Sequence, residues 1–138
     1  MSSFSQYYEV AILNLITGKS ALALPTPYLA LLTVVPTSAS TGATITEATY
    51  TGYARLAAPA ASWAAPVAGT PSTVSNSATL TFAACTAGTS TIVGAVLIDS
   101  ATIGAGNVLG WGTLPNLVVS TTQTPVTFVA GAITITAS

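Results

Sequence analysis

Apolar side chains recur at helical spacing only in the first segment of the chain. The positions on this helical face are Phe4, Tyr8, Ala11, Ile12 and Leu15. Ser3 and Gln6 have the spacing of a capping box, and Gly18 is the residue type that commonly ends a helix. The pattern predicts a helix over about residues 4–17, whose apolar face is covered either by its own domain or by a neighbouring subunit.

After Gly18, short runs of β-branched and small residues alternate with turn-forming residues, which is typical of an all-β chain. The alternation of apolar and polar side chains that is typical of a strand is clearest late in the chain, where Val126 and Phe128 point to one side and Thr127 to the other. The run 91–99 is almost continuously apolar, as in a strand buried on both faces. The predicted strands are 28–35, 50–56, 78–83, 91–99, 108–114, 125–130 and 133–136.

Two longer segments are predicted to be loops, at residues 36–42 and 57–77. Loops of this size in a small domain commonly make contacts with other molecules. The second loop contains Trp63, which either packs back onto the sheet or contacts a neighbouring chain. Tryptophan and tyrosine are favoured at interfaces because they bury a large area at a small entropic cost.

Charged residues are almost absent from this sequence. The 138 residues include 2 basic and 3 acidic side chains and no histidine, so 4% are charged, against about 25% in an average soluble domain. Lys19 and Arg55 alone cannot form a nucleic-acid-binding surface, so we expect no nucleic-acid partner. Electrostatic repulsion between copies of a domain with so little charge is weak, so we expect the domain to associate with other chains. The composition therefore favours a structural subunit over a free enzyme.

The candidate catalytic groups are scattered along the sequence. Glu9, Glu47 and Asp99 show no spacing that would pair two carboxylates, and histidine-based nucleophilic sites are impossible. Cys85 lies in an apolar stretch and is predicted to be a buried hydrophobe. We therefore expect no catalytic residue, no metal site and no cofactor. A small hydrolase built on Lys19 or Asp99 is a hypothesis of a different class, and nothing in the sequence favours it.

Arg55 is the charged residue most in need of a partner. Glu47 and Asp99 are the candidates, and the pair could be buried or could lie at the surface. The glycine-rich segment 103–107 lacks the lysine and the helix of a phosphate loop. It is predicted to be a hairpin turn with Asn107 near the tip.

The mean hydropathy of +0.73 raises the question of a membrane protein. Pro25, Pro27 and Pro36 interrupt the long uncharged stretch before Glu47, and the run 28–35 is too short to cross a bilayer as a helix. The first residues lack the basic segment of a secretory signal. We therefore expect no membrane partner, and synthesis in the cytoplasm of the producing cell.

Several blocks, taken in order, resemble a family of small virion proteins of tailed bacteriophages. They are 28–33 (YLALLT), 52–55 (GYAR), 75–82 (SNSATLTF), 93–99 (VGAVLID), 107–112 (NVLGWG) and 128–135 (FVAGAITI). The resemblance extends over nearly the whole chain. The sequence TQTP at 122–125 departs from the family, where a Gly-Asp turn is common, which puts a charged contact there in doubt.

Members of this family are described as head decoration proteins in some phages and as tail-fibre or minor tail proteins in others. The resemblance implies a single-domain antiparallel β-sandwich, jelly-roll-like, with one N-terminal helix, spanning residues 1–138 with the sandwich from about residue 26. It also implies a structural protein of the virion without catalytic activity.

Our main hypothesis from the sequence is a capsid decoration (cement) protein on the exterior of the capsid. It would bind the major capsid protein as a homotrimer, and would stabilise the head by bridging capsomers. The predicted contact residues are Phe4, Tyr7, Tyr8 and Trp63. The alternative is a tail or tail-fibre component in which Trp63, Tyr50 and Tyr53 stack on host-surface sugars. Aromatics buried against neighbouring chains would favour the first, and aromatics exposed at a tip the second.

Overall fold

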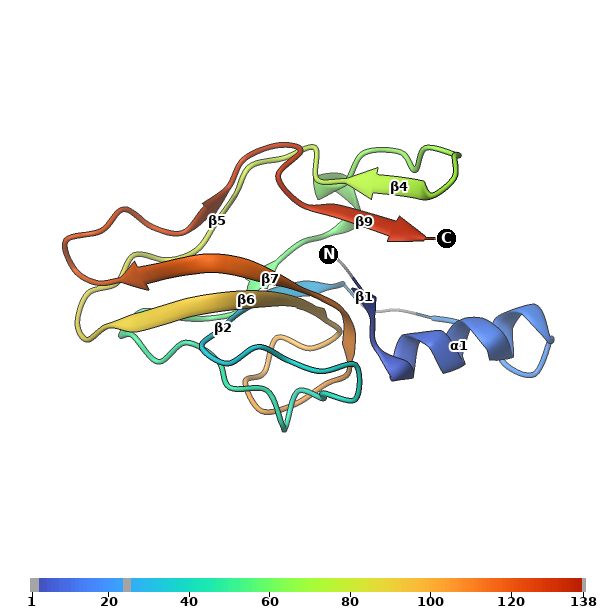
Figure 1. The fold of residues 1–138 in the computed structure, drawn as a ribbon, viewed down its shortest axis with the longest axis horizontal. Coiled ribbons are helices and arrows are strands. Elements are labelled where there is room, and N and C mark those ends of the chain that lie inside the picture. The colour runs from blue at the N-terminus through green and yellow to red at the C-terminus, as the bar shows by residue number, and fades with distance from the viewer. Residues whose placement is uncertain (1–2, 24–25, 138) are drawn as a thin grey trace.

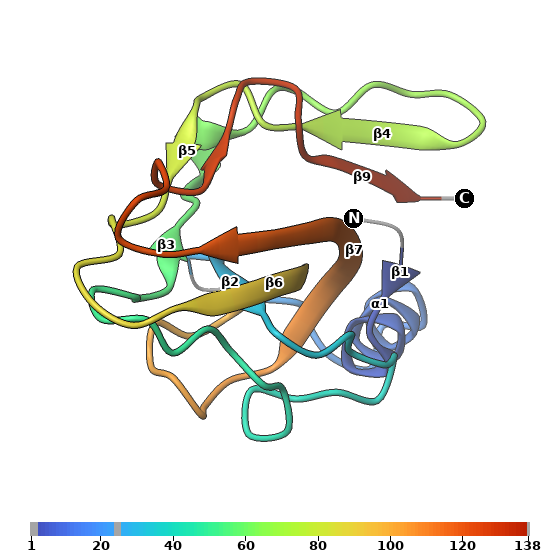
Figure 2. The ribbon, with the colours of Figure 1, turned by 60° about the vertical axis from the view of Figure 1, so that its left-hand side comes forward.

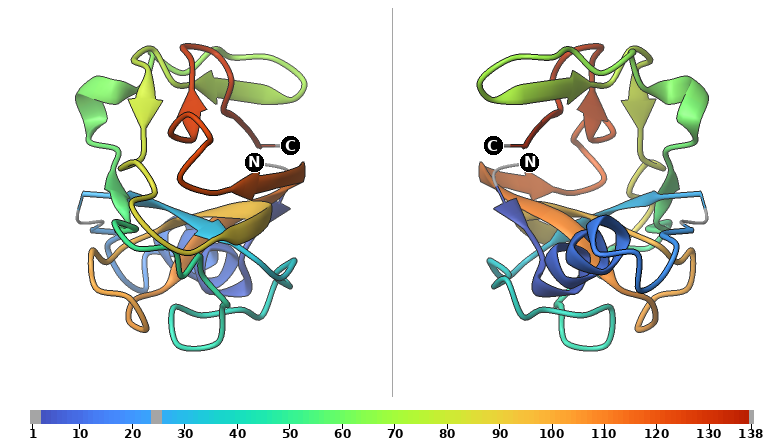
Figure 3. Two further views of the ribbon diagram at one scale, coloured as in Figure 1. Left: turned by 90° about the vertical axis from the view of Figure 1, so that its left-hand side faces the viewer. Right: turned by 90° about the vertical axis from the view of Figure 1, so that its right-hand side faces the viewer.

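A five-stranded antiparallel sheet faced by two short ribbons forms the body of the protein (Figures 1 and 3). The computed structural model describes residues 3–23 and 26–137. The sheet has the strand order β1-β7-β6-β2-β3, and the ribbons pair β4 with β9 and β5 with β8. The strands are β1 (Ser3–Phe4), β2 (Tyr28–Leu32), β3 (Leu56–Ala57), β4 (Ser72–Ser75), β5 (Leu80–Thr81), β6 (Ser90–Ile98), β7 (Val108–Val119), β8 (Thr127–Phe128) and β9 (Thr134–Ala137). These antiparallel layers with one N-terminal helix confirm the predicted mainly β fold.

The β6–β7 hairpin is the centre of the sheet (Figure 2). Its register begins at Ser90 opposite Val119 and ends at Ile98 opposite Val108. A shift between Ile92 and Gly94 lets β7 bulge at Pro115, where proline is tolerated because the ladder is already broken. β6 is buried from Gly94 to its end, which confirms the strand predicted to be covered on both faces.

Apolar residues cover both faces of the sheet. In β2, Leu29 and Leu31 point into the main core, whereas Ala30 and Leu32 belong to a second cluster on the opposite face. The main core also includes Leu80, Phe82, Val126 and Ile133 from the ribbon layer. The second cluster also includes Val96, Ile98 and Val108, with Tyr28, Ile45 and Trp111 packed against it. The sheet is thus the middle layer of the molecule.

The helix α1 (Gln6–Ile16) begins two residues later than the sequence predicts. Phe4 is in β1, opposite Gly110 of β7, and therefore lies outside the helix. Ser5 is the N-cap in place of Ser3, because its side chain accepts a hydrogen bond from the Tyr8 N–H at 3.2 Å.

The other end of α1 is where the sequence places it. Gly18 has a φ of 68°, and its N–H donates to the Leu15 carbonyl at 3.1 Å. The Lys19 N–H donates to the Asn14 carbonyl at 2.9 Å. These two bonds form a Schellman motif, which ends the helix.

Two strand predictions are wrong. Residues 50–56 were expected to be a strand, but only Leu56 belongs to one, because Gly52 turns the chain with a φ of 100°. Residues 72–75 were expected to be in a loop, but they form β4 against β9. No helix within the described residues is long and apolar enough to span a membrane.

Candidate functional site

The helix α1 is attached to the body at its N-terminal end. The Ser5 N–H donates to the Leu109 carbonyl at 3.1 Å, and the Ser5 hydroxyl donates to the Val108 carbonyl. The Gln6 N–H donates to the Ser38 carbonyl at 2.9 Å. From this attachment the helix reaches beyond the end of the sheet (Figure 1). Because only one end is fixed to the sheet, much of the helix surface is left uncovered.

No residue of α1 is fully buried, although most of its side chains are apolar. Tyr7, Val10, Leu13 and Ile16 are exposed by 44%, 55%, 57% and 71%. These four residues follow one another at a spacing of three, so they form a continuous row on the helix surface, which we call the apolar ridge. A helix that is apolar on all sides is normally buried. The apolar ridge is therefore the surface most in need of a partner.

A groove runs along each side of the apolar ridge. On one side, residues 20–23 return along the helix and form a groove with Tyr7 and Val10. On the other side, Phe4, Ile12 and Leu13 form a groove with Ala137 of β9. A ridge between two grooves is the geometry by which helices interlock with a neighbour.

The two exposed charges of the described chain lie at opposite ends of this helix. Glu9 is in the first turn of α1, and Lys19 follows its C-terminal cap. Within residues 3–23 and 26–137, neither side chain has a hydrogen bond or an ion pair. The remaining charged residues, Glu47, Arg55 and Asp99, all have polar partners within the domain.

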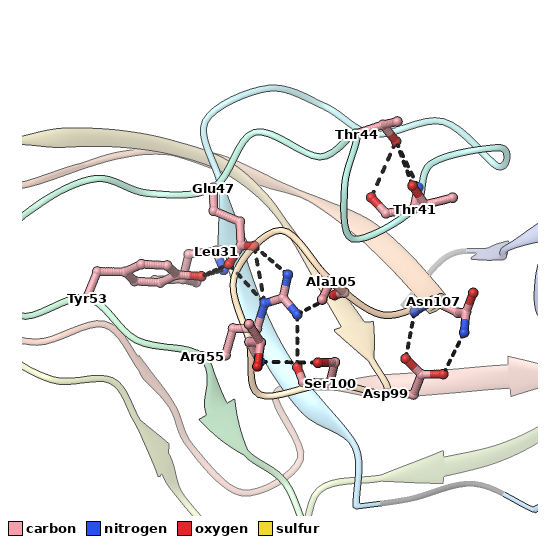
Figure 4. A network of polar contacts seen from close by, with 11 residues as sticks. Leu31, Thr41, Thr44, Glu47, Tyr53, Arg55, Asp99, Ser100, Ala105 and Asn107 are labelled. Atoms are coloured by element: carbon pink, nitrogen blue, oxygen red, sulfur yellow. Dashed lines mark hydrogen bonds and ion pairs between the residues drawn. The ribbon is translucent and has the colours of Figure 1, made fainter.

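The Arg55 side chain forms a buried polar network with Glu47 (Figure 4). Of the two partners that the sequence predicts, Glu47 and Asp99, the structure thus shows Glu47. The Arg55 Nη2 lies 2.6 Å from the Glu47 Oε1, and both side chains are at most 5% exposed. On its other side, Nη1 donates to the carbonyls of Ser100 at 2.9 Å and Ala105 at 2.8 Å. One guanidinium therefore fastens the turn between β6 and β7 to the loop before β3.

The turn at 99–107 is closed by a second pair of contacts. Asp99 accepts hydrogen bonds from the Asn107 N–H at 2.6 Å and from its side-chain amide at 2.9 Å. Asn107 thus lies at the base of the turn, and its predicted place near the tip is wrong. Gly42 packs against this turn so closely that a Cβ would lie 2.0 Å from the Ala105 carbonyl oxygen. The turn is consequently held in a fixed conformation.

Tyr53 completes the network. Its hydroxyl donates to the Glu47 Oε2 at 2.7 Å and accepts from the Leu31 N–H at 3.1 Å. Burial, and then the hydrogen bond to the Glu47 carboxylate and its negative charge, hold the pKa of Tyr53 well above its ordinary value. The raised pKa favours the protonated phenol, which is the form that donates to Glu47.

Between the two layers lies an apolar cavity of about 140 Å³. Leu29, Ala95, Leu114, Phe128 and Ile133 are among its lining residues, and none of the lining side chains is titratable. In the described part of the chain, no three His, Cys, Asp or Glu side chains gather where they could hold a metal ion.

The contact residues predicted from the sequence are in different environments. Tyr7 is exposed on the apolar ridge. Phe4 and Tyr8 are half-buried, with their rings 5.2 Å apart at an angle of 59°. Trp63 is half-buried against the main core, and its Nε1 donates to the Ala58 carbonyl at 3.0 Å. Among the alternative aromatic candidates, Tyr50 is 3% exposed and stacks edge-on against Tyr53.

Of the apolar ridge, only Tyr7 is among the contact residues that the sequence predicts. The helical spacing places Phe4, Tyr8, Ala11, Ile12 and Leu15 on one face. The first four are half-buried, whereas Leu15 is 49% exposed and lies outside the covered face. The signal for a second surface was nevertheless present, since Val10, Leu13 and Ile16 make the outer face apolar as well. An amphipathic helix would have polar residues there.

Comparison with protein families finds a match that extends over residues 3–136. The match defines the chain as a structural protein of the bacteriophage virion. The chain belongs to the family Gp80, described as Podophage GP4 fiber I protein gp80. No curated protein matches the chain. The family confirms the resemblance to phage virion proteins noted in the sequence.

The family description also bears on the two structural hypotheses. It names a fibre, so it favours the tail-fibre alternative over capsid decoration, for which the comparisons give no support. The virion location expected from the sequence agrees with a fibre protein, whereas the capsid exterior in particular has no support.

Proposed function

We propose that this protein is a non-catalytic structural subunit of a bacteriophage tail fibre. The observation that supports the proposal most strongly is the family match, which extends along nearly the whole described chain. The proposal does not include a nucleic-acid or membrane partner, because the two basic residues give neither a phosphate-binding nor an anionic-lipid-binding surface.

Within the fibre, the role that the structure favours is assembly with other protein chains. Five of the exposed large apolar side chains lie within the 11 residues of α1. Burying apolar surface is the main driving force of protein association, and burying unpaired charge opposes it. A projecting helix with exposed apolar side chains and two charges is therefore suited to contact another chain.

Host adhesion through stacked aromatic rings receives less support from the geometry. Tyr50 and Tyr53 belong to the packed interior, and the indole of Trp63 is bonded within its own domain. All three rings pack in or against the main core, so each is at least partly covered within its own domain. We therefore place this subunit in the fibre framework.

The experiment that tests this proposal is cryo-electron microscopy of intact virions, combined with gold-labelled antibodies raised against this chain. We expect density for the domain, and gold label, on fibres at the tail. Regular density over the capsid lattice would overturn the proposal in favour of capsid decoration and contact with the major capsid protein. Absence of the chain from purified virions, checked by mass spectrometry, would overturn both.

A further inference from the structure

The apolar ridge of α1 is complementary to itself when its direction is reversed. Its members are spaced evenly at Tyr7, Val10, Leu13 and Ile16, so a second copy running the opposite way can set the last three against the same three residues. The grooves on either side of the ridge leave this row raised above its neighbours, so the same row of a second copy can lie against it. The same surface can therefore serve as both halves of one contact.

The positions of the charges favour a second copy as the partner. Glu9 and Lys19 lie at opposite ends of the helix, and neither has a polar partner within the described residues. Reversing one helix against the other brings the negative end of each beside the positive end of its partner. An unrelated apolar partner would need its own pair of opposite charges at the same separation, whereas a second copy has them already.

We infer that two copies of this chain pack α1 against α1 in antiparallel fashion, about a two-fold axis that passes beside Leu13. In this register Val10 lies opposite Ile16 of the second copy. Glu9 lies opposite Thr17 of the second copy, the C-cap residue beside the Gly18–Lys19 turn that ends the helix. Antiparallel alignment also brings the N-terminal end of each helix dipole near the C-terminal end of the other.

The size of the contact indicates how strong it is. A helix of 11 residues is about 16 Å long, so one pair of such helices buries less than the roughly 1,200 Å² of a stable standard interface. We therefore expect a weak dimer of the free chain. In a fibre, where neighbouring subunits are held close together, the raised effective concentration would maintain the contact.

Cysteine cross-linking tests the register directly. A residue beside a two-fold axis meets its own copy, so purified Leu13→Cys is expected to form a disulfide-linked dimer under mild oxidation. Opposed positions on packed helices can meet the Cα separation of about 4.4–6.8 Å that a disulfide requires. The matched control is Val129→Cys, since Val129 is similarly exposed but lies outside α1. Cys85 is buried and does not compete.

A mixture extends the same test to a pair of different positions. Val10→Cys mixed with Ile16→Cys is expected to give the heterodimer, faster than either variant cross-links with itself. Equal cross-linking of Leu13→Cys and Val129→Cys would overturn the proposed interface. Cross-linking of Leu13→Cys without the Val10–Ile16 heterodimer would overturn the antiparallel register.

Charge exchange gives an independent readout in the otherwise unmodified chain. Glu9→Lys or Lys19→Glu alone places like charges together at both ends of the pair, and should weaken the dimer roughly 2- to 30-fold in sedimentation equilibrium. The double exchange, Glu9→Lys with Lys19→Glu, should restore the wild-type dissociation constant. Failure of the double variant to recover would overturn the charge pairing, provided that its circular dichroism spectrum matches wild type.

This inference deepens the proposed fibre function and depends on it for the close approach of subunits. The two can nevertheless fail separately, because the cross-linking and sedimentation experiments use the purified chain and the location experiment uses the virion. A dimer in solution with label on the capsid would support the interface and overturn the fibre. Label on the tail with no cross-link would support the fibre function and overturn the interface.

Discussion

Arg55 holds together the loops at one end of the sheet. Its guanidinium lies between the Glu47 carboxylate and the backbone carbonyls of Ser100 and Ala105. The chain has only three acidic residues, and the sequence predicts that either Glu47 or Asp99 is the partner of Arg55. Which of the two it binds depends on how the loops fold, and the sequence alone does not show this.

Removing one member of this buried pair should be costly. We expect Arg55→Ala to lower the free energy of unfolding by about 3–5 kcal/mol, because it leaves the Glu47 carboxylate buried and unpaired. Replacing both residues with apolar ones, as in Glu47→Leu with Arg55→Met, should cost less than the single change. Urea unfolding measures both, and Lys19→Ala serves as an exposed control that changes the value by less than about 0.5 kcal/mol. A loss for Arg55→Ala no larger than this control would contradict the interpretation.

Tyr53 makes stability sensitive to alkaline pH. Its pKa is raised in the folded protein, whereas in the unfolded chain it is about 10. Below about pH 10 the phenol is protonated in both states; above it the unfolded chain loses the proton first. The free energy of unfolding should therefore fall as pH rises beyond 10, by up to about 1.4 kcal/mol per pH unit from this group.

Comparison with Tyr53→Phe isolates this contribution. The variant should be less stable at pH 8, because the Leu31 N–H loses its side-chain acceptor and Glu47 loses one of its hydrogen bonds. Its stability should then decline less steeply than wild type between pH 9 and pH 11. Urea unfolding at several pH values gives both slopes, and identical slopes would refute the assignment.

At the scale of elements, the two ends of α1 differ in how well the sequence predicts them. The C-terminal end depends on Gly18, whose positive φ is a local property of glycine. The N-terminal end depends on contacts between distant parts of the chain: Phe4 pairs with Gly110, and Ser5 bonds to Val108 and Leu109. The capping spacing of Ser3 was present in the sequence, but strand pairing with β7 overrides it.

Ser5 should therefore matter more than an ordinary helix cap. Ser5→Ala removes the acceptor for the Tyr8 N–H and the donor to the Val108 carbonyl. We expect a loss of about 1–2 kcal/mol in the free energy of unfolding. Ser20→Ala, at an exposed position beyond the helix, is the control and should be nearly neutral. A neutral Ser5→Ala would show that α1 is held by other contacts.

The sequence predicts the bounds of a strand best where nearly all of its residues are apolar and buried. β6 is almost entirely apolar, and its bounds differ from the prediction by a single residue at each end. β4 was missed because Ser, Thr and Pro around residues 70–77 are typical of loops. Its pairing with β9 depends on residues far away in the chain. Similarly, residue type alone points to the aromatic residues as contacts, whereas the apolar ridge becomes evident only from the exposed fractions of its side chains.

At the scale of the whole molecule, the scarcity of surface charge should make stability insensitive to salt. Salt screens exposed charges, and here the ion pair of Glu47 with Arg55 is buried. We expect the melting temperature to change by less than about 2 °C between 20 mM and 300 mM NaCl, because a shift of that size corresponds to only a few tenths of a kcal/mol. Differential scanning calorimetry measures this, and a shift several times larger would reveal electrostatic contributions that the structure does not show.

The pairing of the ribbon strands determines when the protein can fold during synthesis. The β6–β7 hairpin joins neighbouring segments, so it can form as soon as its residues leave the ribosome. β4 and β5 pair with β9 and β8, which come later in the chain than the hairpin. β4 and β5 therefore remain unpaired until residues 127–137 have emerged from the ribosome. Until then, the apolar face that the sheet contributes to the main core is not covered by the ribbon layer. For this chain, closure of the second layer is a late event in biogenesis, and premature release would expose the apolar surface that it covers.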